Sequence, residues 1–439
     1  MMQNTNIKKT TIFKTIATFT CIVFLFTTTS CASAVKQETK TLSQSENQIA
    51  KVLSDNELSQ PETELTESEN ELSQSENEVS ILMVGDVLLH DKVSESGQKP
   101  DGTYQYNHLF AQVKSEVSEA DIAIVNQEVI LGGTELGLSG YPSFNGAFEV
   151  GDSIVDAGFD VVLHATNHAL DKGEKGVRNC LDFWQTKYPD IKILGIHNSE
   201  ESKKQLCIIE KNGIKIAILN KTFSTNGIPV PKDAPYLVDY LDKQTLKAEI
   251  ENAEKNADFT VVCVHWGTEY QTEPDDNQVQ MAQFMADEGV DLVLGTHPHV
   301  IEPVEWVTGV NGTKTLVYYS LGNFINATSG TGDKTSDRML GAMATITLQK
   351  TTEHSDITTE TTEAAKTAET TAENSVTITE YGAIPVVSQV KSGYGQMTSY
   401  KLSEYTKVLA KENEILLQDP SFSKEYCTNL WKKVFPEFY

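Results

Sequence analysis

Metal-binding residue types follow five short apolar runs of this chain, although only 9 of its 439 residues are histidine. The runs and the residues after them are Ile81–Val84 with Asp86, Ile122–Val125 with Glu128, Val161–Leu163 with Asn167 and His168, Thr260–Val264 with His265, and Asp291–Leu294 with His297 and His299. Such runs are typical of buried strands, and the carboxyl ends of parallel strands are where a sheet presents functional groups to a ligand. The pattern therefore favours a fold that gathers five strand ends around one site.

Strand-like runs alternate with helical patterns along most of the chain. The predicted strands are Ile81–Val84, Ile122–Val125, Val161–His164, Ile191–Leu194, Ile214–Leu219, Thr260–His265, Asp291–Leu294, Thr315–Ser320 and Met343–Leu348. The predicted helices are Leu109–Val117, Val150–Ala157, Val177–Tyr188, Lys243–Asn256 and Asn277–Glu288. This alternation predicts an α/β fold in which helices cover the sheets.

The residues at the strand ends offer a mixed ligand set. Oxygen ligands are available from Asp86, Glu128 and Asn167, and nitrogen ligands from His265, His297 and His299. This mixture suits a divalent metal such as zinc, manganese or iron. Pro298 separates the last two histidines, which predicts a tight turn that must aim both imidazoles inward.

Each of these residues also has an ordinary structural interpretation. An acid or amide after a strand commonly forms a turn or a helix cap. A lone histidine is more often a hydrogen-bonded polar residue than a ligand, and we prefer that interpretation for His108, His197 and His354. For the whole set we favour one shared metal, because burying so many polar groups without an ion is costly.

His168 and Asp171 form the candidate catalytic pair. His168 follows Asn167 directly and would face any anion held by the metal, where it can donate a proton or stabilise charge. Asp171 is placed to orient an imidazole. The alternative is that Asn167 caps a helix and Asp171 complements its dipole, which leaves the histidines unexplained.

The first 30 residues have the features of a signal peptide. Lys8, Lys9 and Lys14 precede the mostly apolar stretch Ile16–Phe26, which is shorter than the roughly 20 residues of a spanning helix. The small residues before Cys31 are similar to a lipoprotein signal in which this cysteine is lipidated. The alternative is an uncleaved anchor that runs through Val35. Either interpretation places the body outside the cytoplasmic membrane, attached to its outer face.

Two segments have low-complexity composition. Residues 31–78 are rich in Ser, Glu, Gln and Asn, and we expect a disordered acidic stalk, because such a segment buries too little apolar surface to fold. A weak amphipathic helix is the alternative there. Residues 351–375 are Thr, Glu and Ala repeats, and we expect them to loop out as an insertion in a single folded domain at 79–439.

Charge limits the partners of the chain. Acidic residues number 62 against 35 basic ones, for a net charge of −27, so nucleic acid is excluded as an expected ligand. Arg338 lies just before a predicted strand and is an attractive anion clamp, but a single cation in a loop is interpreted here as solvated surface.

Six motifs together resemble the CapA family of capsule-synthesis proteins. In chain order they are Gly85-Asp86, Asn126-x-Glu128, Ala165-x-Asn167-His168-x-x-Asp171-x-Gly173, His265-Trp266-Gly267-x-Glu269-Tyr270, Gly295-x-His297-Pro298-His299-Val300 and Tyr319-Ser320-Leu321-Gly322-Asn323-Phe324. The resemblance runs from about Ser80 to Leu348. It implies a role in making or exporting poly-γ-glutamate and a fold like that of calcineurin-like metallophosphatases, two packed mixed sheets flanked by helices.

The resemblance also implies roles for individual residues. Asp86, Glu128, Asn167, His265, His297 and His299 would face the metal, and His168 would be the catalytic acid. The chain departs from the wider superfamily in two places: no histidine stands two residues after Asp86, so that His90 is a possible substitute ligand, and Glu128 replaces an aspartate. A two-metal mechanism therefore does not transfer automatically.

Two functions stay open from the sequence. The first is a metal-dependent hydrolase of phosphoesters at the cell envelope. The second is a non-hydrolytic capsule component that binds acidic poly-γ-glutamate and membrane partner subunits. An adhesin that uses the fold only as a scaffold is a third possibility, and the complete ligand set argues against it.

Overall fold

The computed structural model describes residues 77–328, 330, 334–352 and 374–439. The predicted signal peptide at 1–30, the stalk up to residue 76 and residues 353–373 of the predicted insertion lie outside the described residues. None of the helices in the described ranges is long and apolar enough to span a bilayer.

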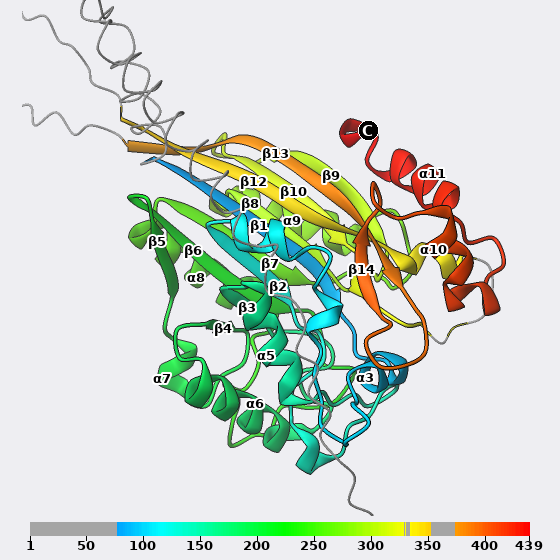
Figure 1. Cartoon of the computed structure of the whole chain (residues 1–439). Coiled ribbons are helices and arrows are strands. Elements are labelled where there is room, and N and C mark those ends of the chain that lie inside the picture. The colour runs from blue at the N-terminus through cyan, green and yellow to red at the C-terminus, as the bar shows by residue number, and fades with distance from the viewer. Residues whose placement is uncertain (1–76, 329, 331–333, 353–373) are drawn as a thin grey trace, which may run out of the picture. The chain divides into compact units, whose positions relative to one another are not determined.

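Two mixed sheets form the framework of the described part (Figure 1). The first sheet has the strand order β14-β13-β12-β1-β2-β3-β4, with β11 paired to β1. Its strands are β1 (Glu78–Val87), β2 (Ile122–Asn126), β3 (Val161–Leu163), β4 (Lys192–Leu194), β11 (Asn323–Ile325), β12 (Leu340–Thr352), β13 (Asn374–Gln389) and β14 (Thr398–Lys401). Strands β1 to β4 are parallel, whereas β12, β13 and β14 are antiparallel to their neighbours.

The second sheet has the order β5-β6-β7-β8-β10-β9. Its strands are β5 (Cys207–Lys211), β6 (Ile214–Thr222), β7 (Phe259–His265), β8 (Leu292–Thr296), β9 (Ile301–Thr308) and β10 (Lys314–Leu321). The four central strands are parallel, and β5 and β9 form antiparallel edges. The predicted α/β fold of two mixed sheets is therefore confirmed.

Strand β7 shows why an unbroken apolar run becomes a central strand. Val261 and Cys263 belong to the core that both sheets share, whereas Val262 and Val264 belong to a second core on the other face. Helices α8 (Lys243–Asn256) and α9 (Asp276–Glu288) contribute Leu246, Ile250, Ala282 and Met285 to that second core. Because β7 is buried on both faces, its sequence does not alternate between apolar and polar residues.

The remaining helices are α3 (Asp91–Ser96), α4 (Lys114–Glu119), α5 (Phe148–Ala157), α6 (Gly173–Lys187), α7 (Glu200–Lys203), α10 (Lys407–Glu412) and α11 (Lys424–Val434). Among these, α5 and α6 contact each other and bury Ile154, Val177 and Trp184 against the first sheet. Their predicted counterparts are confirmed, with ends shifted by a few residues. Cys180, Cys207, Cys263 and Cys427 are free thiols.

The predicted helix Leu109–Val117 is wrong in its extent. Asn107–Leu109 form a 3₁₀ turn, and α4 begins only at Lys114 without a side-chain cap. Leu109, Phe110 and Val113 are fully buried, so packing of the turn replaces the helical repeat that their spacing suggested. The edge strands β5 and β9 and the C-terminal helices α10 and α11 were not predicted from the sequence.

Gly85 brings the two sheets together at the end of β1. The ladder between β1 and β2 shifts register between Val84 and Asp86, and Asp86 donates its backbone N–H to the Gly322 carbonyl oxygen at 3.0 Å. A Cβ at position 85 would lie 2.0 Å from that same oxygen. Only glycine allows this approach. The approach fixes the backbone position from which the Asp86 side chain extends.

We predict that Gly85→Ala destabilises the fold by about 1–3 kcal/mol, because a methyl group meets rigid backbone at a packed position. Urea unfolding followed by circular dichroism measures the change. Gly382→Ala in β13 is the control, because its Cβ meets only the Thr345 hydroxyl, at 3.1 Å, and we expect a smaller loss. Equal stability of Gly85→Ala and wild type would contradict the close approach.

A second prediction concerns Asp291, which precedes β8. Its carboxylate accepts the Thr260 N–H at 2.8 Å, and burial raises the pKa of Asp291 to about 7. The stability that this raised pKa contributes is complete below the ordinary value of about 3.9 and is lost as pH rises through 7. We therefore expect Asp291→Asn to gain stability over wild type as the pH of urea unfolding rises from 5 to 8.

The control for this pH dependence is Asp101→Asn. Hydrogen bonds from Thr103 lower the pKa of exposed Asp101, so this carboxylate stays ionised across the same interval. The difference between that variant and wild type should not change between pH 5 and 8. A flat profile for Asp291→Asn would show that Asp291 ionises normally in the folded protein.

Candidate metal centre

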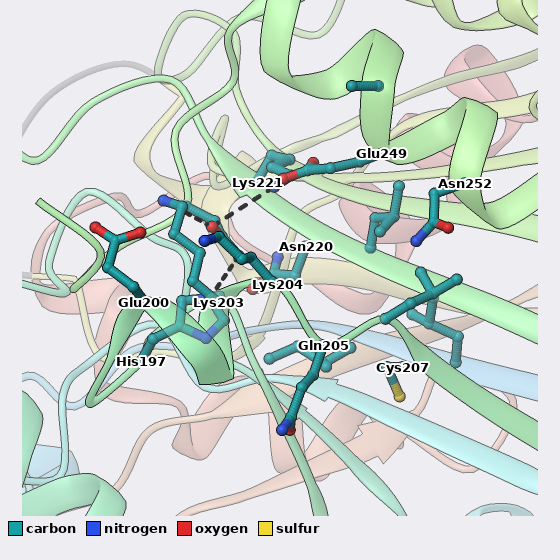
Figure 2. A pocket seen from close by; sticks show the side chains of 17 residues that line it. His197, Glu200, Lys203, Lys204, Gln205, Cys207, Asn220, Lys221, Glu249 and Asn252 are labelled. Carbon is teal, nitrogen blue, oxygen red and sulfur yellow. Dashed lines mark hydrogen bonds and ion pairs between the residues drawn. The ribbon is translucent and has the colours of Figure 1, made fainter.

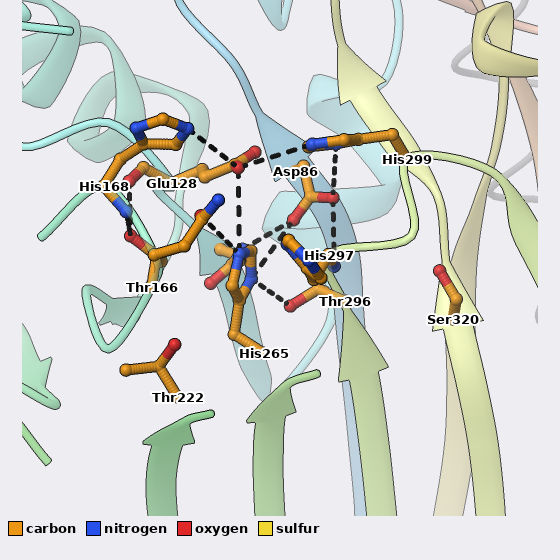
Figure 3. A network of polar contacts seen from close by, with 12 residues as sticks. Asp86, Glu128, Thr166, His168, Thr222, His265, Thr296, His297, His299 and Ser320 are labelled. Atoms are coloured by element: carbon orange, nitrogen blue, oxygen red, sulfur yellow. Dashed lines mark hydrogen bonds and ion pairs between the residues drawn. The ribbon is translucent and has the colours of Figure 1, made fainter. Parts of the chain in front are cut away.

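Side chains from both sheets converge at the carboxyl ends of their strands (Figure 3). Asp86 comes from β1 and His265 from β7, and the loops after β2, β3 and β8 supply the others. Those others are Glu128, Asn167, His168, His297 and His299. All seven are buried, with at most 6% of each residue exposed. The structure thus brings together residues that span more than 200 positions of the sequence.

Glu128 lies in the middle of this group. Its Oε1 atom is 3.6 Å from His299 Nε2, 3.7 Å from His265 Nε2 and 4.0 Å from His168 Nε2. Neither carboxylate oxygen has a hydrogen-bond partner among the described residues, and Glu128 is fully buried. Buried polar atoms are nearly always paired, so these oxygens lack an expected partner.

The segment from His297 to His299 forms the turn that was predicted. Both histidines have positive φ, 99° for His297 and 59° for His299, a conformation that costs energy for residues other than glycine. The backbone N–H of His297 donates to Asp86 Oδ2 at 3.3 Å, and His299 Nδ1 lies 3.3 Å from the same oxygen. The strained turn therefore directs both imidazoles towards Asp86 and Glu128.

Asn323 holds His299 from behind. Its side-chain amide donates to the His299 carbonyl oxygen at 2.9 Å, and its Oδ1 lies 3.1 Å from His299 Nδ1. If this Oδ1 accepts the Nδ1 proton, Nε2 is left free to face Glu128. Asn323 belongs to one of the six family motifs, but its role could not be assigned from the sequence.

His265 and Asn167 face each other across the two sheets. His265 Nε2 lies 2.9 Å from Asn167 Oδ1, and His265 Nδ1 lies 3.0 Å from the Thr296 hydroxyl. Asn126, which belongs to the same family motif as Glu128, donates to Asp86 Oδ1 at 2.7 Å and so orients that carboxylate.

His168 and Asp171 form a hydrogen-bonded pair beside the group. Nδ1 of His168 lies 2.7 Å from Asp171 Oδ2, which also accepts the Phe144 N–H at 2.7 Å. The Phe144 ring packs edge-on against the imidazole with 4.6 Å between centroids. Because Nδ1 is engaged by the acid, Nε2 is the ring atom that points towards Glu128.

Burial and neighbouring charges shift the pKa values of several residues in this group. Burial raises the pKa of Glu128 well above its usual range, and the Asp86 carboxylate adds to this effect. Burial also lowers the pKa values of His265 and His297 far below 6.5, so both imidazoles are neutral and able to bind a metal. For His299, burial is outweighed by Glu128 and Asp86, which raise its pKa to about 9.

These residues fit a divalent cation. One ligand atom each from Glu128, His297 and His299 lie within 4.8 Å of one another, and His297 Nδ1, like both Glu128 oxygens, has no partner among the described residues. A cation placed among them would satisfy these atoms together and offset the buried carboxylates. The geometry therefore describes a candidate metal centre.

The other histidines have separate environments. His90 packs against Phe144 at 5.4 Å, outside the Glu128, His297 and His299 group, and burial lowers its pKa to about 4. His164 accepts the Trp184 N–H at 3.3 Å in the core. His108 contacts Ser96 and His197 contacts Asp239, which confirms their interpretation as bonded polar residues; His354 lies outside the described residues.

Comparisons with known proteins agree with the motifs. Residues 80–328 match the family described as bacterial capsule synthesis protein PGA_cap, which is more than half of the chain. The PGA biosynthesis protein CapA of Bacillus subtilis (strain 168) is 37% identical over 171 residues, which cover 39% of this chain and 43% of that protein. The capsule biosynthesis protein CapA of Bacillus anthracis is 28% identical over 256 residues, 56% of this chain and 59% of that protein. The chain thus spans about half the length of the curated relatives it matches.

Solved structures overlap with this chain only in part. A 5'-nucleotidase precursor from Thermus thermophilus overlaps with a TM-score of 0.41 and 13% identity, over 71% of this chain and 54% of that one. The NAD nucleotidase of Haemophilus influenzae overlaps with a TM-score of 0.41 and 12% identity, over 81% of this chain and 67% of that one. Overlap this partial has no bearing on what the chain does.

Proposed function

Because the chain belongs to the family of bacterial capsule synthesis proteins, we propose that it takes part in the synthesis or export of poly-γ-glutamate through a divalent metal bound at the centre around Glu128. The main observation in support of a bound metal is the buried Glu128 carboxylate. Its two oxygens lack hydrogen bonds among the described residues, and three imidazoles surround it. Family membership supports the biological role, and the ligand geometry supports the chemistry.

The ligand set of this proposal is Asp86, Glu128, Asn167, His265, His297 and His299, with manganese, zinc or iron as the metal. When bound, the cation supplies Lewis-acid polarisation of a substrate oxygen. Asn323 and Thr296 orient His299 and His265 through their Nδ1 atoms, and Asn126 orients Asp86. His90 is outside this set, because it packs on Phe144.

His168 acts in this proposal as the proton donor, and Asp171 positions it. The 2.7 Å contact between Asp171 and Nδ1 fixes the imidazole so that Nε2 faces the centre. Only 6% of His168 is exposed, so water has little access to compete for that proton. The pair resembles the acid and orienting carboxylate of many hydrolytic sites.

The expected surroundings of the protein belong to the same proposal. Its body acts outside the cytoplasmic membrane, held at the outer face by a lipid on Cys31 or by an N-terminal anchor, and works with membrane subunits of a capsule synthase. The support is the composition of residues 1–35 together with the family match of the body.

A second candidate function is a metal-dependent phosphoesterase with no part in capsule formation. The His168–Asp171 pair favours it, because a polymer-binding protein has no need of a positioned proton donor. The two candidates share the metal centre and differ in whether a phosphoester is turned over.

We predict that Glu128→Gln lowers divalent metal affinity at least about tenfold, because it removes the central charged ligand. Mass spectrometry of metal content after loading with Mn²⁺ or Zn²⁺ measures the change. Glu302→Gln is the matched control, since Glu302 is equally buried but bonds Gln278 away from the centre, and it should retain metal. Wild type that binds no metal after loading would contradict the metal proposal.

We predict that His168→Ala lowers kcat for a model phosphodiester by about 10²–10⁴, if the metal-loaded protein is a hydrolase. His197→Ala is the control, because His197 makes a similar 2.8 Å contact with Asp239 outside the centre. Binding of poly-γ-glutamate is measured on the same samples. Metal-loaded wild type that binds the polymer and turns over no phosphoester would contradict the hydrolase and favour the capsule role.

A further inference from the structure

Arg338 is not the solvated surface residue that its sequence context suggested. It lies in a 3₁₀ turn (Thr335–Met339) before β12 and is half-buried. Its guanidinium stacks on the Tyr270 ring with 3.5 Å between the guanidinium carbon and the ring centroid. A guanidinium at this distance is held by cation–π attraction in a fixed plane.

Two connections tie Arg338 to the metal centre. Its backbone carbonyl accepts the Asn323 side-chain amide at 3.0 Å, and that same amide holds His299. On the other side, the Tyr270 N–H donates to the Pro298 carbonyl oxygen at 2.8 Å, and the Tyr270 ring lies 6.0 Å from the His299 ring. Both the backbone and the side chain of Arg338 therefore fix the position of its guanidinium relative to His299.

The hydrogen bonds of the guanidinium leave one edge without partners. Nη1 donates to the Thr328 hydroxyl at 3.0 Å, whereas Nε is buried and has no partner within the described ranges. No ion pair joins Arg338 to a described acid. The Nε and Nη2 edge is the pair of parallel donors that fits the two oxygens of a carboxylate or phosphoryl group.

Arg178, in contrast, has an acidic partner for the same edge of its guanidinium. It is the only other arginine in the sequence, where the remaining basic residues are lysines. Its Nε and Nη2 atoms both contact Glu174 Oε1, at 2.7 Å and 2.5 Å, on the surface of α6. Within the described ranges Arg338 has no such acid, although the chain has a large excess of acidic residues.

A second place with cations is a cavity in which two lysines already have acidic partners. A cavity of about 410 Å³ lies beside the second sheet, with Lys203 and Lys221 in its wall (Figure 2). Lys203 is 3.1 Å from Asp239, and Lys221 is 2.6 Å from Glu249. Both of these lysines are already paired, so an anion binding to either of them would have to displace a carboxylate.

Two exposed aromatic rings lie next to buried histidines of the centre. Tyr270 is 42% exposed, and Phe223, which packs on His297 with 4.9 Å between centroids, is 46% exposed. Both rings reach from the solvent-exposed surface to the buried histidines, a position from which they can contact an entering ligand. A ligand that reached His299 along the Tyr270 ring would pass the stacked guanidinium.

From these contacts we propose that Arg338, held on Tyr270, binds an oxyanionic group of the substrate beside the metal centre through its Nε and Nη2 edge. The proposal rests on the proposed function and extends it to the substrate class, a ligand that carries a carboxylate or phosphoryl group. Tyr270 is a positioning residue for the guanidinium.

The test is calorimetric titration of the Mn²⁺-loaded protein with two probes, inorganic phosphate and an oligomer of γ-linked glutamate. We expect Arg338→Ala to weaken binding of at least one probe about tenfold or more, because a charge-assisted bidentate contact is lost. Arg338→Lys keeps the charge but lacks the fork, and we expect it to lose at least about threefold. Arg178→Ala, the matched control, should bind both probes as wild type does.

The outcomes separate this inference from the metal proposal. Dependence on Arg338 for the oligomer identifies a carboxylate ligand, and dependence for phosphate identifies a phosphoryl ligand; either supports the inference. Unchanged binding in Arg338→Ala, or binding of neither probe by wild type, overturns it. Metal content and thermal melting are measured for every variant, so loss of metal or of folding is detected independently. The titrations are repeated after chelation, so that an effect of Arg338 in protein without metal supports the anion site even where the metal proposal fails.

Discussion

The arrangement of the site depends on one buried carboxylate. Glu128 is fully buried, and neither of its oxygens has a hydrogen bond in the described part of the chain. A buried charge without a partner is expensive, and burial raises the Glu128 pKa accordingly. Three imidazole nitrogens at 3.6 to 4.0 Å are too far away to act as hydrogen-bond donors. A cation among these groups would resolve the conflict, and it would account for the strained and close contacts that hold them.

Close backbone contacts make this geometry possible. The contact at Gly85 lies between the two sheets, and the contact at Gly295 lies between neighbouring strands of the second sheet. At Gly85 and Gly295, an added Cβ would lie 2.0 Å from a carbonyl oxygen of β10 or the residue after it. These contacts bring the ends of β1 and β8 together, and the positive φ values of His297 and His299 then direct both rings inward. Backbone strain at the turn is balanced by its bonds to Asp86 and Asn323. The close contacts and the strained turn therefore position the site residues, while the regular strands stabilise the fold.

Much of the framework could be predicted because buried parallel strands have unbroken apolar sequences. Ligand-type residues after such strands also predicted that Asp86, Glu128, His265 and His299 would meet. The sequence could not show what depends on side-chain direction across distant segments. Asn323 and Thr296 have no pattern that distinguishes an orienting residue from an ordinary turn residue, and Arg338 was misjudged because its partner Tyr270 is 68 positions away. The first half of the predicted helix Leu109–Val117 is a turn instead, because its apolar spacing fits both structures.

Charge explains why a local cationic feature matters in so acidic a protein. With a net charge of −27, the chain repels polyanions at long range, although salt screens this repulsion beyond about 8–10 Å. Binding an anionic substrate therefore requires short-range attraction strong enough to act inside that distance. In the proposed function a divalent cation next to Glu128 would supply charge at the centre, and the guanidinium of Arg338 would supply direction, because its planar edge binds a carboxylate or phosphoryl group in one orientation. Most of the described lysines are exposed or paired with acids, so they do not provide both features in one place.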